Sequence, residues 1–281
     1  MRSKMGITPS ELKDLGEKGF IAAPDESEEA FVKRFDMLTN LAKSPESLLT
    51  GFSFETVDLE RCQFLGANPH WIPLTYSNKK LAPWQGAAMW LFEGRATFPI
   101  IQLRKGFKKG RYLFYSKEEV LAHEVVHAMR MGFNEPRFEE LLAYYHSKST
   151  VRKFLGPLFR TPKQALIFIG WVALSIGCQA ISLFLIDSPF SFLFRGLAFL
   201  PLIDLAFRGA LLLRDFRLLK KAIKKLGTIF SKRGDPFAIA IRLKDSEIQM
   251  FASKDREDLL QAIEKKVPDS LRWRQILAQF C

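Results

Sequence analysis

The stretch that decides the fold is residues 123–147, which read HEVVHAMRMGFNEPRFEELLAYYHS. His123 and His127 lie four residues apart, so on an α-helix they project from one face and both imidazoles can reach one tetrahedral metal ion. Glu124 can then face a water on that metal and accept its proton, the general-base step of zinc-assisted amide hydrolysis. The pattern therefore predicts a Zn²⁺ site with His123 and His127 as ligands and Glu124 as the catalytic base.

The motif lies inside a predicted helix that starts after Ser116, where Ser-Lys-Glu-Glu can form a capping box, and that ends near Met131. Gly132 suits the C-terminal cap, and Pro136 favours the start of a second helix that runs to about Ser147. We therefore expect a helical hairpin with a short turn, in which an acidic residue of the second helix supplies a third ligand.

This stretch resembles the zincin metallopeptidases, and within them the gluzincins, whose third ligand is a glutamate on a following helix. In gluzincins a small residue, often alanine, commonly follows that glutamate by three positions, and Glu140 with Ala143 matches this pattern. The resemblance implies Glu140 as the third zinc ligand, a peptide or protein substrate, and a preceding sheet whose edge strand binds that substrate. It covers residues 70–147 in layout but only residues 123–147 in motif. The interval from His127 to Glu140 is short, and Tyr144 stands where several relatives place an aspartate that supports a histidine.

Two other glutamates compete with Glu140 for the ligand role. Glu139 and Glu140 differ by about 100° around a helix, so they cannot face the metal equally well, and the offset to Ala143 favours Glu140. Glu135 lies in the turn and is the weaker candidate. His70 lies in a loop before a predicted strand, and we do not expect it to be a ligand.

Further residues near the motif each have two interpretations. Tyr144, Tyr145 and His146 could donate hydrogen bonds to a tetrahedral oxyanion, or they could serve packing and capping. Arg130 could bind a substrate carboxylate, or it could form a structural ion pair with Glu139.

Residues 52–115 carry aromatic and β-branched runs broken by turn residues, which predict a small sheet. The expected strands are residues 71–76, 88–92, 98–103 and 112–115. Pro99 has no N–H to donate, which predicts residues 98–103 as an edge strand where an extended substrate could pair.

Residues 166–186 contain no charged side chain and are long enough to cross a hydrocarbon core of roughly 30 Å. A break at Asp187-Ser188-Pro189 lets the chain turn back, and residues 190–213 predict a second span. This span holds Asp204 and Arg208 one helical turn apart, as an internal ion pair or, alternatively, as part of a proton or ion path. A basic amphipathic helix follows at residues 214–233.

The formal net charge of +12 raises nucleic acid as a partner. Much of the excess borders the apolar block, however, so anionic lipid headgroups are the simpler partner and no nucleic acid is expected. The flanking basic residues are Lys148, Arg152, Lys153, Arg160 and Lys163 before the block, then Arg214, Arg217, Lys220, Lys221, Lys224 and Lys225 after it.

The predicted loop at residues 187–194 has no Lys or Arg, so the positive-inside rule places both termini in the cytoplasm. We therefore expect a multi-pass protein of the cell (inner) membrane with its catalytic domain facing the cytoplasm.

Residues 1–20 lack the apolar region of a secretory signal. The three separated cysteines indicate neither a disulfide framework nor a cysteine zinc site.

Together these features predict an α+β fold. A zincin-like catalytic domain, built from a small sheet, the HExxH helix and the glutamate helix, would carry a two-helix transmembrane hairpin and a small C-terminal α/β piece. The expected divisions are a helical N-terminal layer at 1–50, the zinc peptidase domain at 51–150, the transmembrane hairpin at 165–213, the basic amphipathic helix at 214–233 and the C-terminal domain at 234–281.

The leading functional hypothesis is a membrane-anchored zinc peptidase that hydrolyses peptide bonds by metal-activated water with Glu124 as general base. The alternative is a non-catalytic membrane scaffold or sensor that retains a structural metal site, which the intact Glu124 disfavours. An intramembrane protease is disfavoured because the motif lies in a charged helix some forty residues before the first span.

Overall fold

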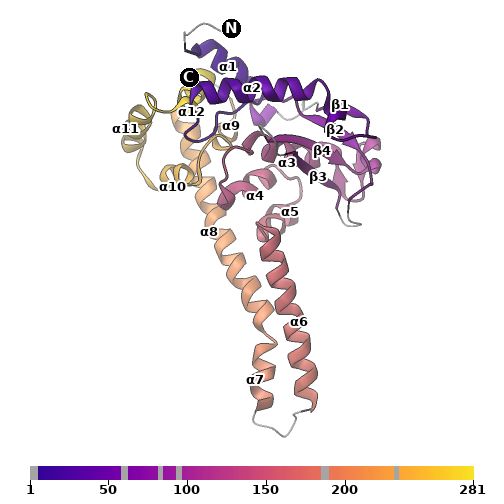
Figure 1. Cartoon of the computed structure of the whole chain (residues 1–281). Helices are drawn as coiled ribbons and strands as arrows, with labels where there is room; N and C mark the ends of the chain where they lie inside the picture. The colour runs from indigo at the N-terminus through magenta and orange to yellow at the C-terminus, as the bar shows by residue number, and fades with distance from the viewer. Residues whose placement is uncertain (1–5, 58–62, 82–84, 93–96, 185–189, 231–233) are drawn as a thin grey trace. The chain divides into compact units, whose positions relative to one another are not determined.

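The computed structural model describes residues 6–57, 63–81, 85–92, 97–184, 190–230 and 234–281. The chain divides into two compact units, residues 1–135 with 219–281, and residues 136–218. Figure 1 labels the helices and the strands β1 to β4. The first unit contains helices and a small sheet, and the described residues of the second contain helices, so the predicted α+β class is confirmed.

The sheet of the first unit has the spatial order β1 (Phe54–Thr56), β2 (Pro73–Tyr76), β4 (Phe98–Leu103), β3 (Ala87–Phe92). β2 and β4 run parallel, while the β1–β2 and β4–β3 pairs are antiparallel. A separate two-stranded hairpin joins β5 (Arg111–Tyr112) to β6 (Tyr115–Ser116). All the predicted strands therefore exist, although the last one is this hairpin.

The prediction that residues 98–103 form an edge strand is wrong. β4 lies between β2 and β3, and all its residues are buried, whereas β3 lies at the edge of the described sheet. Pro99 is tolerated because the β2–β4 pairing starts only at Ile101, two residues later. A missing N–H excludes proline from a full ladder, but not from the end of one.

Helices from both ends of the chain share one core with the sheet. α1 (Pro9–Glu17) and α2 (Glu28–Ala42) form the predicted helical N-terminal layer, and Thr8 caps α1 by accepting from the N–H of Glu11. α1 packs against the last helix, α12 (Leu271–Phe280). The residues of this core include Leu12, Leu15, Phe31, Leu38, Phe98, Ile100 and Leu271.

The predicted C-terminal α/β piece is wrong in its strand content, because the described residues 234–281 form helices. These helices are α9 (Pro236–Ala240), α10 (Asp245–Ser253), α11 (Arg256–Lys266) and α12. The apolar run at 237–241 begins a helix because Asp235 caps the N–H of Phe237 at 2.8 Å and Pro236 occupies the first turn. Every residue of this short run is apolar, so the sequence shows no alternation of apolar and polar residues that would distinguish a helix from a strand.

Two buried arginines hold this C-terminal region: Arg130 joins it to the rest of the first unit, and Arg272 bonds within it. Arg130, the last residue of α3 (Lys117–Arg130), donates to the carbonyls of Ile241 and Leu243 at 2.7 and 3.1 Å. Arg272 of α12 donates to the carbonyl of Arg242 at 2.6 Å. Carbonyls just past a helix end have no helical partner, so these guanidinium groups satisfy them.

The second unit contains α4 (Pro136–Tyr144), α5 (Thr150–Leu155), α6 (Pro162–Phe184), α7 (Phe190–Leu197) and the start of α8 (Leu200–Ile229). Two stretches, Lys163–Phe184 and Ser191–Ile229, are long and apolar enough to cross a membrane. Only 17% and 6%, respectively, of an apolar 18-residue segment within each stretch is buried. The core helix of a soluble protein would bury most of such a stretch, so this exposure favours lipid as its surroundings.

Within this unit α6 packs against α7 (Figure 1). Arg208 donates to Asp204 at 2.7 Å, so the predicted internal ion pair is confirmed. The predicted turn at residues 187–189 lies outside the described residues.

The predicted basic amphipathic helix at residues 214–233 is not a separate element, because α8 passes through position 213 without a break. Its predicted apolar stripe consists of Phe216, Leu219, Ile223, Leu226 and Phe230, of which Leu219 and Leu226 are fully buried. The stripe therefore packs inside the protein instead of lying in a membrane interface. Its period is the same in either case, so the sequence alone does not separate the two.

Candidate metal centre

Helix α3 presents the motif residues on a half-buried face. Ser116 caps the helix by accepting from the N–H of Glu119 at 3.2 Å, as predicted. The opposite face packs against β3 and β4. Its buried residues are Leu121, Ala122, Val125, Val126, Ala128 and Met129. Burial of that face leaves His123, Glu124 and His127 half-buried on the other.

The ring nitrogens of the two histidines have the spacing that two ligands of a tetrahedrally coordinated metal ion require. Their Nε2 atoms lie 3.3 Å apart, and the ring planes meet at 79° with centroids 4.8 Å apart. Zn–N bonds of about 2.0–2.1 Å at a tetrahedral angle place two ligand nitrogens about 3.3–3.4 Å apart. The imidazoles therefore fit a shared metal ion.

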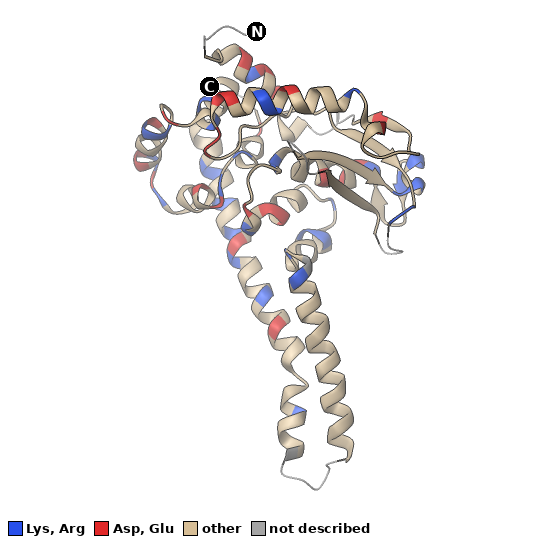
Figure 2. Ribbon diagram, in the orientation of Figure 1, with Lys and Arg blue, Asp and Glu red and all other residues tan. Residues whose placement is uncertain are grey.

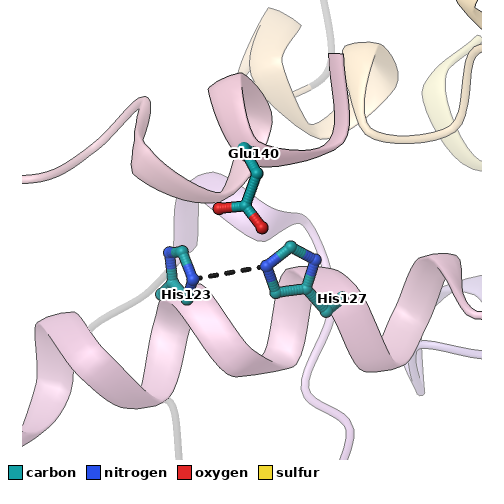
Figure 3. A group of neighbouring side chains, drawn as sticks. All are labelled: His123, His127 and Glu140. Carbon is teal, nitrogen blue, oxygen red and sulfur yellow. Dashed lines mark hydrogen bonds between the residues drawn. The ribbon is translucent and has the colours of Figure 1, made fainter. Parts of the chain in front are cut away.

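Glu140 lies on α4, and its carboxylate points toward both imidazoles (Figure 3). One ligand atom from each of His123, His127 and Glu140 lies within 4.8 Å of the other two. Two imidazole nitrogens and one carboxylate oxygen match the donor set of a catalytic zinc site with an open fourth position. The three ligands predicted from the sequence thus form a cluster that could hold a metal ion.

The competing candidates lie outside this cluster. The Glu135 carboxylate accepts from the N–H of Asp245 at 2.9 Å, at the start of α10. The Nδ1 atom of His70 lies 2.8 Å from the carbonyl of Val57. Glu139 is half-buried on α4 and is not among the clustered residues.

The contacts of Tyr144 and Arg130 favour structural interpretations of these two residues. A Cβ added at Gly156 would lie 2.6 Å from the ring of Tyr144, so this ring rests directly on the backbone there. The rings of Tyr145 and His146 meet edge to face at 5.1 Å. Arg130 is only 1% exposed and donates to the carbonyls of Ile241 and Leu243, so it is too deeply buried to bind a substrate at the surface.

A buried carboxylate that the sequence analysis did not single out anchors α4. Asp215 of α8 is 1% exposed and accepts from Arg137 of α4 at 2.6 Å and from Arg160 at 2.8 Å. Arg137 precedes Glu140 by three residues, so this ion pair holds the turn of α4 next to the ligand. In the sequence, Asp215 is recognisable only as an acidic residue within a basic segment. That pattern does not identify its partners, which lie 55 and 78 residues away in the chain.

No protein-family model, curated protein or solved structure matches this chain. The resemblance of residues 123–147 to the gluzincins therefore rests on the motif and on the cluster of His123, His127 and Glu140.

Proposed function

We propose that this chain is a membrane-anchored zinc peptidase of the gluzincin type. The observation that carries the proposal is the convergence of His123, His127 and Glu140, with Glu124 beside the first ligand on α3. Structural zinc sites are closed by four protein ligands, whereas three ligands leave a position open for chemistry. A carboxylate base beside the first ligand also has no use in a purely structural site.

A zinc ion held by these residues would lower the pKa of a water molecule and polarise the scissile carbonyl. Glu124 then removes the proton from the attacking water and delivers it to the leaving amine. The imidazole nitrogens of His123 and His127 are held in position because both side chains project from one helix, α3, whose opposite face is buried against the sheet. Glu140 comes from the neighbouring helix, so the site depends on how α4 is held.

We propose that the substrate pairs with β3 and not with β4, because β3 is an edge strand of the described sheet and β4 is not. α3 packs against β3, so a peptide added to this edge would extend beside the motif helix. Main-chain hydrogen bonds to the edge would bind the substrate independently of its sequence, and side-chain pockets would set specificity.

The basic flanks of the two candidate spans favour a cytoplasmic location for the catalytic residues. The predicted loop at 187–194 lacks Lys and Arg, while the segments before and after the spans are rich in them. The proposed site therefore acts on substrates from the cytoplasmic side.

The test is metal analysis paired with turnover. Full-length protein purified without chelator should contain about one zinc per chain and should cleave a mixed peptide library read by mass spectrometry. Chelation should abolish cleavage, and added zinc should restore it. Absence of a transition metal, or cleavage that survives metal removal, would overturn the proposal. Bound zinc without cleavage would instead support the scaffold or sensor alternative.

A further inference from the structure

The β5–β6 hairpin presents two large apolar side chains to solvent. Leu113 and Phe114 form its two-residue turn and are 72% and 85% exposed. Leu113 has a φ of 51°, a conformation for which hairpin turns use Gly, Asn or Asp. A bulky residue with this φ is strained. The exposure of both side chains and the strain at Leu113 oppose folding, so burial in the core does not explain these two residues.

The base of the hairpin is held firmly, so the tip projects from a rigid support. Tyr112 packs against Phe107, which is fully buried, with ring centroids 5.6 Å apart. Gly106 lies directly under the same ring, where a Cβ would collide with it. The N–H of Lys117 donates to the carbonyl of Gly110 at 2.9 Å and closes the loop.

The segment around this tip is strongly basic. Residues 104–117 contain six Lys or Arg and no Asp or Glu. Figure 2 shows basic residues gathered on the loops beside the sheet. The exposed ones in this segment are Lys105, Lys108, Lys109 and Arg111.

A neighbouring loop adds further positive charge. The N–H of Lys105 donates to the Asn78 side chain at 3.0 Å, which brings the exposed Lys79 and Lys80 close to the same segment. Lys108 and Lys117 both lie over the ring of Tyr76, at 5.4 and 5.2 Å. Positive charge therefore surrounds the base of the apolar tip.

We propose that residues 105–117, the basic hairpin, dock on an anionic lipid surface. Leu113 and Phe114 enter the boundary between headgroups and acyl chains, and the exposed Lys and Arg side chains meet the lipid phosphates. A nucleic acid would match the charges, but an aliphatic Leu113 gains nothing from stacking on bases. An acidic peptide would likewise leave the apolar tip in water.

This contact is independent of the proposed peptidase activity, but it bears on the metal centre. β6 ends at Ser116, which caps α3, and His123 follows seven residues later. A hairpin docked on lipid would therefore fix the start of the metal-binding helix relative to the bilayer. We infer a second attachment to the membrane, separate from the candidate spans.

The test is hydrogen exchange of the full-length protein in lipid nanodiscs. Amides of residues 105–117 should be protected in nanodiscs that contain phosphatidylglycerol, relative to nanodiscs of phosphatidylcholine alone, and high salt should remove the difference. Equal exchange in the two lipids would overturn the proposal. Protection that appears only after nucleic acid or acidic peptide is added would also overturn it.

Two variants separate lipid contact from folding. Leu113→Gly with Phe114→Asn places glycine at the position whose φ is positive, so it should retain or raise the melting temperature while losing the lipid-dependent protection. Changing Lys108, Lys109 and Arg111 to Gln should also abolish the protection. The matched control changes three exposed lysines on other elements, Lys18, Lys33 and Lys43, and should keep it. Protection that survives in the turn variant would contradict the role of the apolar tip.

Discussion

Removal of the Glu140 carboxylate should weaken zinc binding much more than removal of the Glu139 carboxylate. The Glu140 carboxylate converges with the imidazoles of His123 and His127, with ligand atoms within 4.8 Å, whereas Glu139 lies about 100° further round the helix. Zinc sites with four protein ligands bind with roughly 10–16 kcal/mol, so one ligand contributes roughly 3–4 kcal/mol. Glu140→Ala should therefore lower zinc affinity by about two to three orders of magnitude.

The assay is competition between the protein and a chelator of known zinc affinity, with the melting temperature of each variant as a check on folding. Glu139→Ala is the matched control, and it should bind zinc within a fewfold of the native chain. Glu140→Gln keeps the size of the side chain but removes its charge, so it should give an intermediate affinity. Zinc loss in Glu139→Ala with retention in Glu140→Ala would refute the ligand assignment.

Three further predictions concern the support of the site, the pH dependence and the topology. Asp215→Asn leaves two arginines without their buried anion, so it should cost about 3 kcal/mol in thermal unfolding, whereas Arg214→Gln, whose side chain is 59% exposed, should cost little. Burial alone would raise the pKa of Glu247, but the charge and hydrogen bond of Arg272 outweigh it and lower that pKa from 4.5 to about 2. Stability of about 3 kcal/mol is then present above pH 4.5 and is lost as the pH falls toward 2; melting curves of Glu247→Gln should lack this loss. A cysteine placed at Ser188 should react with an impermeant reagent outside intact cells, and labelling of the N-terminal domain instead would reverse the proposed orientation.

The parts of the site that the sequence could predict are those fixed by local chemistry. His123 and His127 can reach one ion through helical spacing alone, and the start of their helix follows from Ser116 and the residues after it. Helix register left both Glu139 and Glu140 open, and the gluzincin pattern of a small residue three positions later, here Ala143, selected Glu140.

The predictions that failed depend on contacts between distant segments. Pro99 indicates a gap in a ladder, but only the partner strands show that β4 is central and that its pairing with β2 starts later. The apolar stripe of α8 has the same period on lipid as in a core, and burial decides between them. Asp215 gains its role from arginines far along the chain, which no local pattern reveals.

The most direct measurement of the central claim is the zinc content and peptide turnover of Glu124→Gln beside the native chain. Glu124 is proposed to move protons and not to bind metal, so the variant should keep about one zinc per chain and lose roughly 10²–10⁴ in turnover. Full turnover in the variant would contradict the proposed mechanism. Loss of zinc would contradict the assignment of Glu124 as a base that is not a ligand.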